Sequence, residues 1–240
     1  MFSETFEFIE ECHCEFPMAI CTLGAGLLAV TKRRDSMLAI FQATDHKISF
    51  LRNILVPCKF YLRQVAFKQE KLFVVCDENE IHVMNTSGVA LSKISSGVPT
   101  EYGFIRNFDV SDDATRLYLC ERSGLRCLSD TGECQWWFSQ TDLPEWDRNK
   151  QGLVIEDIRF FNGFLFGSLW KASKLIMMSN DGHLLCYIVT TGIDHPRAIA
   201  VRGDRLVVTQ FSPSMRPVKN RTVHVFRIGD LFSSVGEKQQ

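Results

Sequence analysis

The sequence predicts an all-β fold, a β-propeller of five blades, with six as the alternative count. A short apolar run, a tight polar turn and a second apolar run recur five times along the 240 residues. The recurring positions Ile20, Val65, Phe108, Ile158 and Ile199 are spaced by 45, 43, 50 and 41 residues. A period of about 40–45 residues with several short strands is typical of a propeller blade. Because one such unit cannot bury both faces of its sheet, neighbouring units must stack.

Length and composition predict one monomeric domain over 1–240. Apolar residues make up 45% of the chain, which is enough for a substantial core. No stretch approaches the roughly 18 apolar residues of a membrane helix, so no membrane partner is expected. The first sixteen residues hold five glutamates and no Lys or Arg, unlike a secretory signal. The nine scattered cysteines fit a reducing compartment, and we expect a cytoplasmic protein.

Each blade is expected to hold four strands, named a to d from the propeller axis outward. The first blade (17–57) has its strands at 18–21, 27–30, 37–41 and 47–51. The second blade (58–99) has its strands at 64–67, 72–75, 80–84 and 89–94. In the second blade, the alternation in IHVM and the Ser87-Gly88 turn are hairpin signals.

The third and fourth blades follow the same order. The third blade (100–144) has its strands at 107–110, 116–120, 124–128 and 134–138. The fourth blade (153–193) has its strands at 157–160, 164–168, 174–179 and 184–189. Their c–d connections, SDTGE and NDG, contain the residues that tight turns favour.

The fifth blade (194–228 plus 5–10) shows only three strands in its own segment, at 198–201, 205–209 and 222–227. Residues 5–10 alternate apolar and acidic side chains, as a half-solvated outer strand does. Pairing 5–10 beside 222–227 would close the ring and remove exposed strand edges. A helix over 3–11 is the alternative, because glutamate is a good helix former.

The fifth blade carries a family resemblance. The segment HPRAIAVRGDRLVVTQ, followed after an insertion by NRTVHVFRI, resembles an NHL repeat. That pattern runs through a proline, an apolar strand, a turn, a valine-rich strand, Asn-x-Arg and a VxVF-like strand. The second blade shows the same order, and DVSDDATRLYL in the third resembles the related TolB and YVTN repeats. The fourth blade departs from the pattern, because LWKASKLIMM lacks the Asp and Asn-Arg positions.

The resemblance implies a parent class, the tripartite-motif (TRIM) ubiquitin ligases. These carry an NHL propeller at the C-terminus, which chooses protein substrates or RNA. The chain shows no RING-type or B-box zinc pattern. The resemblance therefore implies that this chain is only a targeting module.

Catalytic and metal sites are not expected. Polar residues at the starts of a-strands are Asn107, Glu156, Asp157 and His195, which we interpret as solvated loop charges or turn caps. Glu156 and Asp157 are adjacent, so they point to opposite faces of a strand. The cluster Cys12-His13-Cys14 lacks a second ligand pair at zinc spacing. We therefore expect no catalytic residues, no metal and no cofactor.

Tryptophans offer one binding candidate. The four tryptophans, Trp136, Trp137, Trp146 and Trp170, could form a binding platform. Trp136 and Trp137 lie on an expected outer strand, where one of the two must face inward between blades, and core packing is their other interpretation. Trp146 lies in the long polar connection 140–152, where no packing role is evident. Large aromatic side chains anchor interfaces, so Trp146 is a candidate ligand-binding residue.

Basic residues cluster in the b–c loops of blades one, four and five. In a propeller these loops and the d–a connections emerge on one face, and ring closure makes these three blades neighbours. A basic arc of this kind would receive RNA phosphates or an acidic protein segment, and a merely solvated surface is the other interpretation. The arc comprises Lys32, Arg33, Arg34, Lys171, Lys174, Arg216, Lys219 and Arg221.

The sequence thus predicts non-catalytic recognition of a protein substrate or partner through the b–c loop face. An RNA-binding propeller is the alternative. The net charge of −1 excludes a polybasic nucleic-acid binder, so that alternative depends on the local arc. A propeller hydrolase or lactonase is the second alternative, and the lack of convergent polar residues disfavours it.

Overall fold

A computed structural model describes most of the chain and divides it into two compact units, Met1–Phe104 and Ile105–Gln240. The described residues are 13–44, 47–59, 62–76, 79–97, 104–122, 124–139, 142, 155–188, 192–210 and 223–229.

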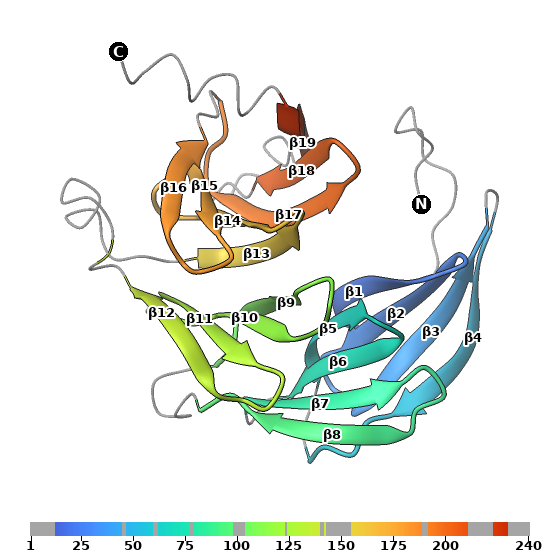
Figure 1. Cartoon of the computed structure of the whole chain (residues 1–240). Coiled ribbons are helices and arrows are strands. Elements are labelled where there is room, and N and C mark those ends of the chain that lie inside the picture. The colour runs from blue at the N-terminus through green and yellow to red at the C-terminus, as the bar shows by residue number, and fades with distance from the viewer. Residues whose placement is uncertain are drawn as a thin grey trace, which may run out of the picture. The chain divides into compact units, whose positions relative to one another are not determined.

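Five antiparallel sheets confirm the predicted all-β, five-bladed propeller fold (Figure 1). Within each sheet the hydrogen-bonded neighbours follow one another in sequence. The first unit holds β1 (Pro17–Gly24), β2 (Leu27–Lys32), β3 (Met37–Ala43) and β4 (Ile48–Leu55), then β5 (Leu62–Lys68), β6 (Lys71–Cys76), β7 (Glu80–Asn85) and β8 (Ala90–Ser95).

The second unit holds the other three sheets. Its strands are β9 (Asn107–Val110), β10 (Arg116–Cys120), β11 (Gly124–Ser129) and β12 (Cys134–Ser139), then β13 (Ile155–Phe161), β14 (Phe164–Leu169), β15 (Lys174–Ser179) and β16 (Leu184–Ile188), then β17 (Pro196–Arg202), β18 (Arg205–Gln210) and β19 (Val223–Arg227). The last sheet has three strands in the described ranges. The predicted closing strand, 5–10, lies outside the described residues.

Apolar side chains between successive sheets form the core of each unit. In the first unit, Leu38 and Ile40 of one blade pack with Leu72 and Val74 of the next. In the second unit, one cluster joins the sheets of blades three and four, and another joins those of blades four and five. Tyr118 and Phe160 stack in the former cluster, with ring centroids 5.5 Å apart. Because successive side chains of a strand point to opposite faces, each sheet can place apolar side chains on both faces and pack against the sheets beside it.

A hydroxyl near the end of the second strand recurs in three blades. Thr31 Oγ1 accepts from the Ala19 amide at 2.9 Å, Ser168 Oγ from the Asp157 amide at 3.1 Å, and Thr209 Oγ1 from the Ala198 amide at 3.1 Å. Each contact lies beside a register shift in the first strand. The shift explains why β13 begins at Ile155, where the sequence predicts 157. A hydroxyl satisfies the amide that the bulge removes from the ladder.

No helix in the described ranges is long and apolar enough to span a membrane.

Candidate ligand-binding site

Of the predicted basic residues of blade one, Lys32 is the last residue of β2, and Arg33 and Arg34 lie in the β2–β3 turn of the first unit. Lys32 Nζ forms an ion pair with Asp35 at 2.7 Å, and the Arg34 guanidinium lies 4.9 Å from the Phe16 ring centroid. The Arg33 amide donates to the Phe16 carbonyl at 2.9 Å. These three basic residues therefore make contacts within their own blade in addition to carrying positive charge.

Lys171 lies in the β14–β15 turn of the second unit, as the sequence predicts for a b–c loop, and Lys174 is the first residue of β15. The Lys174 ammonium lies 4.4 Å from the centroid of the Tyr187 ring. The other predicted binding residues, Arg216, Lys219, Arg221 and Trp146, lie outside the described residues. Because the described basic residues divide between the two units, their union into one arc stays a prediction.

The β14–β15 turn belongs to a polar and aromatic cluster that the sequence analysis did not assemble. Ser173 Oγ donates to Asp194 Oδ1 at 2.9 Å and accepts from the His195 amide at 3.2 Å. The Asp194 amide donates to Gln210 Oε1 at 3.2 Å, and that oxygen lies 3.0 Å from His224 Nε2. These contacts tie the b–c turn of blade four to the connection that enters blade five.

His195 is the strained member of this cluster. Its φ of 49° lies in the left-handed region, although Pro196 follows and disfavours helical backbone conformations at the preceding residue. The imidazole lies edge-on to Trp170, with ring centroids 5.3 Å apart. Its buried Nδ1 atom lies 2.6 Å from Asp194 Oδ1, within ion-pair distance but without the alignment of a hydrogen bond. Such outliers persist only where the surroundings impose them, and they concentrate at functional sites.

We name this cluster the loop-face site. Its members come from the β14–β15 turn, from the connection before β17 and from β18 and β19. They are Trp170, Lys171, Ser173, Lys174, Asp194, His195, Gln210 and His224.

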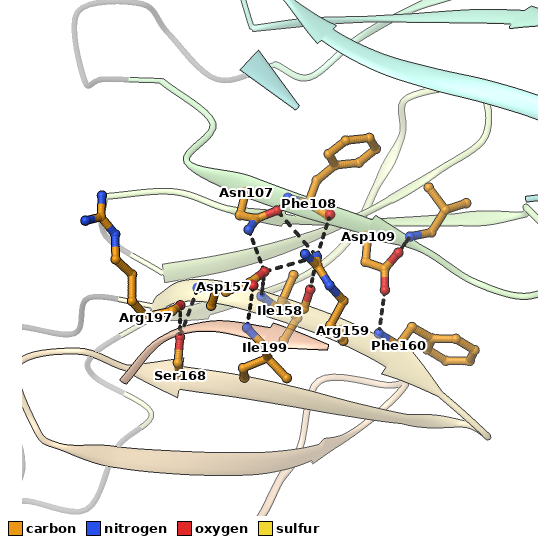
Figure 2. Close-up of polar contacts among 12 residues, drawn as sticks. Asn107, Phe108, Asp109, Asp157, Ile158, Arg159, Phe160, Ser168, Arg197 and Ile199 are labelled. Carbon is orange, nitrogen blue, oxygen red and sulfur yellow. Dashed lines mark hydrogen bonds and ion pairs between the residues drawn. The ribbon is translucent and has the colours of Figure 1, made fainter. Parts of the chain in front are cut away.

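Hydrogen bonds that join the first strands of blades three, four and five, together with one from Ser168 of β14, position this site (Figure 2). Asp157 Oδ2 accepts from the Ile199 amide of β17 at 2.7 Å, and Ser168 Oγ donates to the Arg197 carbonyl at 2.9 Å. Both contacts hold the beginning of β17, two to four residues after His195. The scaffold therefore fixes the connection that carries the imidazole.

Asp157 itself is a candidate that sequence reasoning interpreted wrongly. Its side chain is 1% exposed and is not a solvated loop charge. Its Oδ1 atom accepts from Asn107 Nδ2 at 2.5 Å and from the Ile158 amide at 2.8 Å, and lies 3.0 Å from the Arg159 guanidinium. Figure 2 shows these donors converging on the carboxylate from two strands. Their positions on separate blades explain why the sequence did not reveal the cluster.

Burial raises the pKa of Asp157 from 3.8 to about 6, although the Arg159 charge and the amides of Ile199 and Ile158 favour the ionised form. A perturbed carboxyl often marks a catalytic site. Here protein donors already engage both oxygens, so the carboxylate serves as a link between strands. The second link is Asp109, whose Oδ2 accepts from the Phe160 amide of the next blade at 2.8 Å.

The other sequence candidates lie in comparable contacts. Glu156 pairs with Arg106 at 2.6 Å, and both side chains are partly exposed. The prediction of core packing holds for Trp136, which packs against the core between blades three and four. It is wrong for Trp137, which is 37% exposed because it occupies the opposite face of the outermost strand. Of the Cys-His-Cys cluster, Cys12 lies outside the described residues.

The comparisons with known proteins support the architecture. No protein-family model and no curated protein sequence matches the chain. Similar solved structures include a catalytically inactive histidine-to-alanine variant of virginiamycin B lyase from Staphylococcus aureus with quinupristin (TM-score 0.59, 18% identity), covering 80% of this chain and 62% of that one. Another is the computationally designed protein Ika8 (TM-score 0.57, 10% identity), covering 88% of this chain and 58% of that one.

The shared property is the fold. The chain spans about three fifths of the length of these two proteins. Because an enzyme and a designed protein both match it, the architecture alone does not select an activity.

Proposed function

We propose that this chain is a non-catalytic recognition module that binds an acidic segment of a protein partner through the loop-face site. The observation that carries the proposal is the hydrogen-bonded union of the β14–β15 turn with the connection before β17. Ser173 joins the two segments through Asp194 and the His195 amide. This union brings the β14–β15 turn, which carries Lys171 and the Trp170 indole, beside the connection that carries the His195 imidazole, and Lys174 follows as the first residue of β15. Basic side chains beside aromatic rings favour a negatively charged ligand.

The absence of an available acid in the buried network also supports recognition over catalysis. Asp157 accepts from donors on three strands, and Asp109 accepts from Phe160 and Val110 amides. A general base needs a lone pair directed at its substrate. The NHL resemblance adds an analogy: propellers of this type select substrates for TRIM ubiquitin ligases, and we extend the proposal to such a targeting role.

Charge reversal tests the recognition proposal. Binding of a fluorescent oligoglutamate peptide is measured by polarisation for the full chain and for the variant Lys171→Glu/Lys174→Glu. We expect the variant to lose about tenfold in affinity, because the two substitutions replace attraction by repulsion. Arg205→Glu is the matched control, because Arg205 is the exposed first residue of β18, at the other end of its blade.

Two outcomes would contradict the proposal. One is equal binding by the wild type and the lysine variant. The other is preferential binding of an oligouridine RNA with a steep salt dependence, which would assign the loop face to nucleic acid instead.

A propeller hydrolase or lyase is a second candidate, and His195 is the observation that favours it. Asp194 lies 2.6 Å from Nδ1, and a carboxylate beside one ring nitrogen favours acid–base chemistry through the other nitrogen. The similar lyase structure is an inactive histidine-to-alanine variant. Incubation with quinupristin and simple lactones, followed by mass spectrometry, tests this candidate. Turnover that His195→Ala abolishes would support it, whereas unchanged substrates would leave recognition as the function.

A further inference from the structure

A second surface lies on the outer side of the second unit, away from the residues of the loop-face site. It is an open groove of ≈ 690 Å³ between β12 of blade three and the β15–β16 turn of blade four. We name it the outer groove. Its lining includes Trp136, Trp137, Asp142, Asp181, Gly182 and His183.

One wall of the outer groove is the β15–β16 turn, which is held in place by Trp136 of β12 on the opposite wall. Its indole N–H donates to the Asn180 carbonyl at 3.0 Å. Its ring lies so close to Gly182 that a Cβ atom there would come within 2.7 Å of it. Arg116 Nη1 donates to the same carbonyl at 3.0 Å and to Asp181 Oδ1 at 3.1 Å. The turn and the strand are therefore held at a set separation, and a ligand need not order them.

The other wall is an edge strand. β12 is the terminal strand of its sheet, so within the described ranges no further strand pairs with its outer side. Alternate residues of such a strand direct amide and carbonyl groups away from the sheet, which makes it a template for an added strand. Trp137 remains 37% exposed on this strand, while the Arg126 guanidinium, 5.1 Å from its centroid, supports the ring.

The negative charge of the outer groove favours a positively charged ligand. Asp142 and Asp181 are exposed carboxylates, and no Lys or Arg belongs to the lining. Asp142 Oδ2 accepts from the Ser139 amide at the end of β12, which holds this carboxylate beside the strand. Arg116 engages one oxygen of Asp181, whose side chain is still 66% exposed. An exposed indole beside carboxylates is a favourable setting for an ammonium or guanidinium group.

From the edge strand, the carboxylates and the exposed indole together, we propose that the outer groove binds an extended, basic protein segment. The segment adds as a strand to β12 and places Lys or Arg side chains against Trp137, Asp142 and Asp181. This site is independent of the loop-face site, which carries the opposite charge.

A peptide of alternating lysine and valine, labelled with fluorescein, tests the proposal by polarisation on the full chain. We expect saturable binding, a loss of about tenfold in Asp142→Asn/Asp181→Asn, and a similar loss in Trp137→Ala. Asp204→Asn is the matched control, because Asp204 is an exposed acid in the β17–β18 turn. Lys171→Glu/Lys174→Glu should bind this peptide as the wild type does, which separates this site from the proposed function. Unchanged thermal melting of the asparagine variant excludes unfolding as the cause of its loss.

Strand addition is tested with the same peptide N-methylated at alternate residues, in both registers. At least one methylated register should fail to bind, because methylation removes the amide hydrogens that would pair with β12. Three results would overturn the proposal: no binding of the lysine peptide, equal binding of a glutamate counterpart, or full affinity in the asparagine double variant. Full binding of both methylated peptides would overturn the strand-addition mode.

Discussion

Replacing Ser168 by alanine tests how the buried network supports blades four and five. Ser168 is fully buried, and its hydroxyl accepts from the Asp157 amide and donates to the Arg197 carbonyl. Alanine removes the hydroxyl while leaving little new cavity, so the cost comes from two unsatisfied main-chain groups. A buried unsatisfied group costs about 1–3 kcal/mol. The Arg197 contact is only partly buried, so we expect a total loss of about 2 kcal/mol.

The assay is urea unfolding followed by tryptophan fluorescence, with thermal melting alongside. For a chain of this size a loss of 2 kcal/mol lowers Tm by roughly 4–8 °C. Ser168→Thr is the matched control, because Thr31 and Thr209 make the same amide contact in other blades. Asp130→Ala, on an exposed turn residue, should change stability by no more than about 0.5 kcal/mol.

Two results would refute this reasoning. Ser168→Ala could unfold within about 0.5 kcal/mol of the wild type, which would mean that solvent satisfies both groups. Alternatively, Ser168→Thr could be as unstable as Ser168→Ala, which would show that packing and not the hydroxyl sets the cost.

Three further predictions concern other parts of the chain. Burial raises the pKa of Asp157 from 3.8 to about 6. The contribution of this residue to the free energy of unfolding is therefore largest below pH 4 and falls by about 3 kcal/mol as pH rises through 6. Asp157→Asn should flatten this part of the stability–pH curve, and an unchanged curve would contradict the raised pKa. Gly182→Ala should cost about 1–2 kcal/mol and change tryptophan emission, because φ is +86° and the new methyl would meet the Trp136 ring; wild-type emission and stability would show that the ring moves freely. Deleting residues 1–11 should lower Tm, because the last sheet has three strands in the described ranges and the sequence predicts that 5–10 supplies the fourth; an unchanged Tm would exclude that role.

The sequence predicted the fold because the information is periodic and local. The five apolar repeats indicated five sheets, and the turn residues separated the strands within them. The starts of β1, β5, β13 and β17 were predicted one or two residues late, because register shifts extend their pairing. A bulge leaves no apolar pattern, so periodicity alone does not reveal it.

The contacts of the candidate site could not be predicted in the same way. Asp157 receives its amide donor from Ile199, 42 residues later, and its side-chain donor from Asn107, 50 residues earlier. Only the stacking of blades brings these residues together. A signal was available for the bulge contacts, because hydroxyl residues recur near the ends of β2, β14 and β18. These residues, Thr31, Ser168 and Thr209, stand among the apolar residues that set the period, so the apolar pattern alone does not mark them.

The positions of the carboxylates argue for functions carried by loops and edges in this propeller. Asp109 and Asp157 are buried, and their oxygens are engaged by amides of the next blade. Asp142 and Asp181 are exposed and lie in a groove beside an edge strand. A substitution in the first pair should therefore act mainly through stability, and one in the second pair mainly through binding. Measuring both quantities on each variant separates the two roles, and a binding defect in Asp109→Asn at unchanged stability would contradict this division.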